Sequence, residues 1–237
     1  SRVLWDDALA VKFNTTETEI HERLFTAKKI LLDARNQRPQ PHRDDKIVTA
    51  WNGLAIGALA RGAKTLDRPD LANAAHEVAQ FLKNNLWDGT DLFRTYRGQR
   101  GNVKAFPADY SFLIAGLIEL HEVIPSAGWL DWVRVLQHTL DENFWDHSRF
   151  GYVMRSQLAG ETLMVIREDY DGAEPSPNHL AAENLIKLAA ICGVPNYAAR
   201  AEVLLRAGKR VLETQPFAAP LLLAAFDLNC RKFGLRD

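Results

Sequence analysis

The chain has few cysteines, no excess of charge of either sign and no long hydrophobic run. Its two cysteines, Cys192 and Cys230, are too few for a disulfide framework or a four-ligand zinc site, and we expect both to be small buried hydrophobic residues. The 29 Lys and Arg residues nearly match the 30 Asp and Glu residues, which gives no general attraction to nucleic acid. The longest apolar run, 216–226, contains two prolines and is shorter than the roughly 20 residues of a membrane span. We therefore expect neither a nucleic acid nor a membrane partner.

The sequence also lacks the short motifs of several enzyme classes. It contains no glycine-rich phosphate loop, no Gly-x-Ser-x-Gly and no His-Glu-x-x-His. Neither cysteine lies near the Asp and His partners that a zinc-dependent toroidal prenyltransferase needs, so we expect no metal and no cofactor. The first seven residues do not combine a basic start with an apolar stretch, and without a visible targeting segment a cytoplasmic location is expected.

What is present is a typical globular composition with strong helical spacing. Hydrophobic residues make up 47% and charged residues 25% of the chain, as in a folded domain. Thr16 to Glu19 has the form of a capping box, and Ser176, Pro177 and Gly193 mark the start and end of another helix. These signals predict eight helices, at about residues 16–31, 44–66, 69–86, 107–124, 129–144, 176–192, 197–213 and 220–233. From the second helix to the eighth, buried and amphipathic helices alternate, which indicates two layers.

A sequence pattern returns after 58 residues. Asn85-Leu86-Trp87-Asp88 resembles Asn143-Phe144-Trp145-Asp146, and each stretch precedes a short alternating segment, at 92–96 and 152–154, expected to be a small strand on the rim. A repeating unit of inner helix, outer helix and extended segment is typical of a helical array. The predicted fold class is all-α, an α/α toroid with short rim strands. Because about four hairpins are counted where a complete barrel needs about six, we expect an incomplete toroid that occupies residues 1–237 as one domain.

Polar residues concentrate at the beginnings of three predicted inner helices, within residues 38–52, 104–110 and 167–179. If the inner helices point the same way around a ring, the three clusters meet at one mouth of a central funnel. The candidate residues are Asp45, Asp109 and Glu174 for catalysis and His42, Arg43, Trp51, Asn52, Tyr110, Asn178 and His179 for substrate binding.

These residue types suit a polyhydroxyl ligand. Carboxylates, Asn and Arg form paired hydrogen bonds with neighbouring hydroxyls, and the flat faces of Trp51 and Tyr110 would cover the apolar side of a sugar ring. Two carboxyls, one kept protonated, would supply the acid and base of a glycosidase-like reaction. His42 or His179 would instead carry the proton in an isomerase or epimerase. The predicted function is binding of a small sugar, with modification by one of these routes as its enzymatic form.

Each candidate also has a structural role open to it. Asp45 and Asp109 fall in predicted first turns, where the helix dipole favours a carboxylate. Trp51 on a buried helix fits a core position, and His179 fits a bond to a neighbouring carbonyl. If the polar clusters satisfy one another, the toroid is a noncatalytic interaction module that presents a partner surface to an attached redox domain.

The three clusters resemble those of a known family. Arg-Pro-x-Pro-His-x-Asp-Asp-Lys-x-x-x-x-Trp-Asn-Gly at 38–53, Asp-Tyr-x-Phe-Leu-Ile at 109–114 and Tyr-Asp-Gly-Ala-Glu-Pro-Ser-x-Asn at 170–178 are similar to the spermatogenesis-associated protein twenty family, within a match over about residues 20–230. The resemblance implies a longer parent, in which a thioredoxin-like domain precedes a six-hairpin toroid similar to N-acylglucosamine epimerases and six-hairpin glycosidases. It also implies that this chain lacks the thioredoxin-like domain and the first part of the toroid. Pro177 stands where the family usually has Gly, and Ala108 where a second acid often precedes the Asp-Tyr pair, so Asp109 is a single acid here.

Overall fold

The computed structural model describes residues 5–158 and 161–234. The chain divides into two compact units, Ser1–Asp45 and Lys46–Asp237. In the first unit, α1 (Asp6–Phe13) packs against α2 (Glu17–Asn36). Thr16 caps α2 by accepting a hydrogen bond from the Glu19 amide at 3.2 Å, which confirms one half of the predicted capping box. The Glu19 carboxylate accepts instead from the Thr15 hydroxyl and from Arg23. The sequence signals did not predict α1, and the single domain predicted over residues 1–237 stays a prediction.

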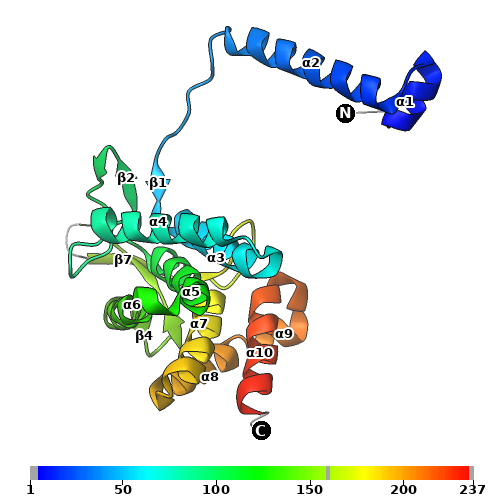
Figure 1. Cartoon of the computed structure of the whole chain (residues 1–237). Helices are drawn as coiled ribbons and strands as arrows, with labels where there is room; N and C mark the ends of the chain where they lie inside the picture. Colours follow the sequence, from blue (N-terminus) through cyan, green and yellow to red (C-terminus); the bar gives the residue numbers. More distant parts are fainter. Residues whose placement is uncertain (1–4, 159–160, 235–237) are drawn as a thin grey trace. The chain divides into compact units, whose positions relative to one another are not determined.

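Helices in two layers make up most of the second unit (Figure 1). The inner helices pack side by side in chain order: α3 (Thr49–Leu66), α5 (Pro107–Val123), α7 (Pro177–Cys192) and α10 (Pro220–Phe233). The outer helices α4 (Pro69–Leu86), α6 (Trp129–Phe144) and α8 (Pro195–Ala207) pack against α3, α5 and α7 respectively. Of the four helices predicted to be buried, α5 and α7 are buried on nearly every side, because each has both inner and outer neighbours, whereas most residues of α10 are exposed or half-buried.

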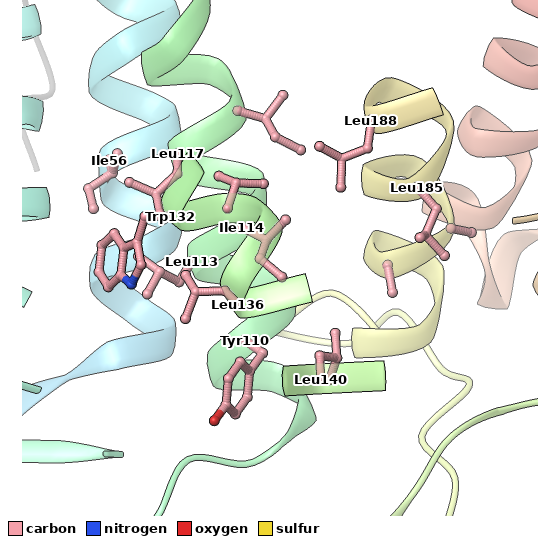
Figure 2. Close-up of a cluster of buried hydrophobic side chains, with 14 of the residues drawn as sticks. Ile56, Tyr110, Leu113, Ile114, Leu117, Trp132, Leu136, Leu140, Leu185 and Leu188 are labelled. Carbon is pink, nitrogen blue, oxygen red and sulfur yellow. The ribbon is translucent and has the colours of Figure 1, made fainter. Parts of the chain in front are cut away.

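The core lies where α5 meets α6 and α7. Figure 2 shows Leu113, Ile114 and Leu117 of α5 in one cluster with side chains of α6 and α7, and all three side chains are fully buried. The prediction that α3 is buried on all sides is wrong. It packs mainly against α4 and α5, which leaves exposed a side that includes Trp51 and Ala55.

The backbones of α3 and α5 come into direct contact. A Cβ atom placed on Gly116 would lie 2.2 Å from the carbonyl oxygen of Gly53, and one placed on Gly53 would lie 2.5 Å from the amide nitrogen of Leu113. Glycine lowers the stability of a helix interior by about 1 kcal/mol relative to alanine. Close packing is the physical reason for glycine at both positions.

Short antiparallel strands connect the helices. β1 (Ile47–Val48), β2 (Thr95–Arg97) and β3 (Gln99–Arg100) form one sheet in that order. The other pairs are β4 (Trp145–Asp146) with β5 (Gly151–Tyr152) and β6 (Met154–Leu158) with β7 (Glu161–Ile166). The strands predicted at 92–96 and 152–154 overlap β2 and β5, with bounds shifted by a few residues.

The internal repeat is visible in the turns that follow α4 and α6. The Asp88 carboxylate accepts hydrogen bonds from the amides of Thr90 and Asp91. After α6, the Asp146 carboxylate accepts from the amides of Ser148 and Arg149. The two Trp-Asp stretches 58 residues apart therefore form the same kind of turn, each closed by its own aspartate.

Three of the predicted helices have different bounds. The helix predicted over 16–31 continues to Asn36. The helix predicted from residue 44 begins at Thr49, because Ile47 and Val48 pair with β2 as a strand. Asp45 therefore does not occupy the first turn of a helix. The helix predicted over 197–213 is divided into α8 and α9 (Lys209–Thr214). The division falls at Gly208, where a Cβ atom would lie 2.1 Å from the Leu222 side chain.

Within the described residues, no helix combines the length and the apolar character needed to cross a bilayer.

Candidate functional site

The inner helices begin at the same end of the second unit. The Asp109 carboxylate near the start of α5 accepts a hydrogen bond from the Ala50 amide at the start of α3, at 3.1 Å. The Asp171 carboxylate joins the starts of α7 and α10 by accepting from the amides of Ser176 at 2.8 Å and Leu221 at 2.9 Å. The predicted common direction of the inner helices is therefore present, and the second and third polar clusters meet at this end.

A pocket of about 240 Å³ opens between the starts of α5 and α7; we call it the main pocket. Apolar and polar side chains both contribute to its wall. It is lined by Arg94, Phe106, Pro107, Ala108, Tyr152, Met154, Ile166, Glu168, Glu174 and Pro177. Of the predicted catalytic residues, Glu174 lines this pocket.

A neighbouring tryptophan orients Glu174. The indole Nε1 of Trp51 donates a hydrogen bond to Glu174 Oε1 at 2.5 Å, across 123 residues of sequence. Trp51 is 58% exposed, so it is not a core residue and its ring is accessible to solvent. The structure thus brings together a predicted carboxylate from the third cluster and a predicted aromatic platform from the first.

Arg94 supplies the positive charge of the main pocket. Its guanidinium contacts the Asp109 carboxylate at 3.1 Å and lies 4.9 Å from the centre of the Phe106 ring. The sequence patterns predicted neither Arg94 nor Phe106 as a site residue. Arg94 lies just before β2, in a rim segment that was interpreted only as a strand, whereas Phe106 lies inside the second polar cluster, one residue before α5.

Asp109 is fully buried and has three hydrogen-bond donors around it. Besides the Ala50 amide and Arg94, the Phe106 amide donates to it at 2.9 Å. Burial raises the pKa of Asp109 above its ordinary value, although all three donors act in the opposite direction. These contacts favour the structural role that was left open for Asp109. Its catalytic role stays a prediction.

Tyr110 lies in the core and offers no open ring face. It is 2% exposed, and Figure 2 shows it within the buried cluster. Its ring packs 5.8 Å from that of Phe144, and its hydroxyl accepts a hydrogen bond from the Leu92 amide. Tyr110 as a sugar platform is therefore not supported. Its place in sequence, one helical position after Asp109, turns its side chain inward towards α6.

Asn178 and His179 are buried near the main pocket and bind other parts of the chain. The Asn178 side chain accepts from the Tyr152 amide at 2.8 Å and donates to the carbonyls of Tyr152 and Glu168. Nδ1 of His179 lies 3.0 Å from the Asp171 carboxylate, and both side chains are more than nine-tenths buried. Both residues therefore hold the wall of the pocket in place.

The remaining candidates belong to the first cluster. Asn52 donates from its side chain to the Val48 carbonyl at 2.9 Å and so stabilises the start of α3. His42, Arg43 and Asp45 are exposed residues of the first unit, and their predicted roles in the site stay predictions. In the part of the chain that the structure describes, no three His, Cys, Asp or Glu side chains gather as metal ligands.

Inner and outer helices around a polar mouth define the class of the α/α toroid. A solved GH76 α-mannanase of Bacteroides thetaiotaomicron matches 83% of this chain and 56% of its own, with a TM-score of 0.66 and 10% identity. A sugar epimerase from a ruminal bacterium matches 82% of this chain and 57% of its own, with a TM-score of 0.63 and 14% identity. The predicted fold class is confirmed, and at these identities the likeness is one of fold.

The sequence relatives are more specific. The chain is 34% identical over 227 residues to spermatogenesis-associated protein 20 of Homo sapiens, which covers 91% of this chain and 29% of the human protein. The protein of the same name from Mus musculus is 32% identical over 222 residues, covering 89% of this chain and 28% of its own length. The chain is thus homologous to part of spermatogenesis-associated protein 20, and the predicted family resemblance is confirmed. It spans less than a third of the length of these relatives. No family model matches the chain.

Proposed function

We propose that this chain binds a small sugar in the main pocket. The observation that carries the proposal is the placement of Glu174, which lines the pocket while Trp51 orients its carboxylate. Carboxylate and guanidinium groups bind neighbouring hydroxyls, and Phe106 gives the pocket an aromatic wall for the apolar side of a sugar ring.

The size of the pocket favours one sugar ring as the bound unit. Its volume of about 240 Å³ lies slightly below the roughly 300–1,000 Å³ of pockets for drug-sized ligands. Arg94 is kept in position by Asp109, so Asp109 contributes to this site through another residue. The catalytic role of Asp45, the third predicted catalytic residue, stays a prediction from the sequence.

The enzymatic form of this proposal uses the two carboxylates that line the pocket, Glu168 and Glu174. One carboxyl acting as acid and the other as base would suit either glycoside hydrolysis or proton transfer next to a sugar carbonyl. The fold likeness to a mannanase and a sugar epimerase is compatible with both reactions.

Ligand-observed NMR and thermal unfolding of the full chain with a panel of mono- and disaccharides test the binding. A sugar present at 100 times its Kd stabilises the folded state by about 2.7 kcal/mol, which raises the unfolding temperature measurably. Glu174→Gln should reduce this stabilisation. Glu122→Gln is the matched control, since Glu122 pairs with Lys64 on the surface and does not line the main pocket. A panel without any response would refute the proposal.

The two enzymatic forms, proton transfer and glycoside hydrolysis, give different products in heavy water and can be told apart by them. An epimerase or isomerase of the proton-transfer type incorporates deuterium next to the carbonyl carbon when aldoses are incubated in heavy water, and a glycosidase releases new reducing ends. Loss of either signal in both Glu168→Gln and Glu174→Gln would support the two-carboxylate mechanism. A signal that survives both substitutions would contradict it.

A second candidate function is a noncatalytic interaction module. The observation that favours it is that Asp109, Asn178 and Asp171 are all engaged in contacts within the chain. In that case the full chain would bind a thioredoxin-like domain in a calorimetric titration and would bind no sugar of the panel. Sugar binding that depends on Glu174 would exclude this candidate as the sole function.

A further inference from the structure

Two carboxylates border two adjoining hollows at the mouth of the toroid. A second hollow, of about 380 Å³, shares Ala108, Glu168, Glu174 and Pro177 with the main pocket. Any ligand that occupies either hollow therefore meets the side chains of Glu168 and Glu174. The sign of the charge around these two residues determines which sugars the site accepts.

The described cations around the two hollows already have their own anions. Arg94 pairs with Asp109 at 3.1 Å, and Arg167 pairs with Asp169 at 3.0 Å. Among the side chains that the structure describes, no cation pairs with Glu168 or Glu174, and the described partner of the Glu174 side chain is the neutral indole of Trp51. The described lining of the site therefore carries a net negative charge.

The helix starts at this end do little to offset that charge. The beginning of a helix attracts anions through its unpaired amides. Here α5 and α7 both start with a proline, Pro107 and Pro177, which has no amide hydrogen. Ser176 also accepts a hydrogen bond from the His179 amide, and Asp109 accepts one from the Phe106 amide. These helix starts therefore offer fewer open amide donors to a phosphate or a carboxylate than an uncapped helix start without proline.

We propose that the site selects a sugar that carries a protonated amino group and rejects sugars that carry a carboxylate or phosphate. This inference rests on the proposed sugar-binding function and names its ligand class. An ammonium group in the pocket would lie close to Glu168 and Glu174, which have no competing cation among the described side chains. An anionic substituent at the same place is repelled by both carboxylates.

Calorimetric titration of the full chain with four probes tests the selection: D-glucosamine, N-acetyl-D-glucosamine, D-glucose and D-glucuronate. At about pH 6 a free sugar amine is protonated and a carboxylate is ionised. We expect glucosamine to bind at least about tenfold more tightly than its uncharged N-acetyl form, and glucuronate to bind more weakly than glucose by a similar factor. Raising the salt from about 0.01 M to about 1 M, where the screening length falls from about 30 Å to about 3 Å, should reduce both ratios.

The carboxylate variants show whether these two residues are the cause. Glu168→Gln and Glu174→Gln should each reduce the ratio of glucosamine to N-acetylglucosamine affinity several-fold, and Glu122→Gln should leave it unchanged. Glucose binding without any preference for glucosamine, or with tighter binding of glucuronate, would overturn this inference and leave the proposed function standing. If none of the sugars binds, both fail.

Discussion

Replacing Gly116 by alanine tests how closely the two inner helices α3 and α5 must pack. The added Cβ atom would lie 2.2 Å from the Gly53 carbonyl oxygen, and restoring an ordinary contact of 3.4 Å requires a movement of about 1.2 Å. The atom it meets belongs to the backbone, so no change of rotamer relieves the clash. One helix must move, which also disturbs the contacts that Leu113 and Leu117 make in the core.

The magnitude follows from two opposing contributions. Overpacking of a well-packed core costs about 1–3 kcal/mol, and more where backbone must shift, whereas alanine gains about 1 kcal/mol of helix propensity over glycine. We expect Gly116→Ala to lower the free energy of unfolding by about 2 kcal/mol. For a chain of this size that corresponds to a decrease in Tm of about 4–8 °C.

Urea unfolding followed by circular dichroism measures the effect, with Gly62→Ala as the matched control. Gly62 lies in α3 as well, but the nearest atom to its added Cβ is a methyl carbon of the Leu71 side chain at 3.3 Å. That side chain can move, so the propensity gain remains and Gly62→Ala should be neutral or stabilising. If Gly116→Ala is as stable as Gly62→Ala, the backbone contact between α3 and α5 does not limit their packing.

Three further predictions concern buried polar groups. Asn178→Ala removes the partners of the Tyr152 amide and carbonyl, and urea unfolding should show a loss of about 2–4 kcal/mol. Asp109→Asn replaces one of two acceptor oxygens by an amide group, so at least one of the donors loses its partner, and it should cost about 1–3 kcal/mol in the same assay; an unchanged midpoint would contradict the capping role. Burial raises the pKa of Tyr110 to about 12, above the value of about 10 for an unfolded tyrosine. The stability from its neutral hydroxyl is therefore complete below about pH 10 and is lost as the pH rises to about 12. In Tyr110→Phe this alkaline loss should be smaller, as followed by circular dichroism against pH.

The sequence was sufficient where local signals determine structure. The capping serine and the glycine at the end of α7 gave its bounds to within one residue, because caps satisfy backbone groups within a few residues of the chain. The repeat after α4 and α6 was predictable for the same reason. Each aspartate closes a turn with amides two and three residues away.

The sequence was insufficient where a partner lies far along the chain. The start of α3 was predicted five residues too early, since the pairing of Ile47 and Val48 with β2 is invisible to helical spacing. Arg94 was missed as a pocket residue because its position depends on Asp109, 15 residues later. The contrast between exposed Trp51 and buried Tyr110 likewise depends on which neighbours each helix has, which no local pattern encodes.

The hydrogen bond from the Ala50 amide to Asp109 couples the first turn of α3 to the presence of α5. An isolated α3 has no side chain of its own to cap its first turn, since Val48 offers no acceptor and the acceptor for Ala50 is 59 residues away. The first turn of α3 is therefore complete only while α5 is docked beside it. Amide protons at the starts of α3 and α5 should exchange with solvent in the same opening event, although Ala50 and Asp109 lie 59 residues apart in the sequence.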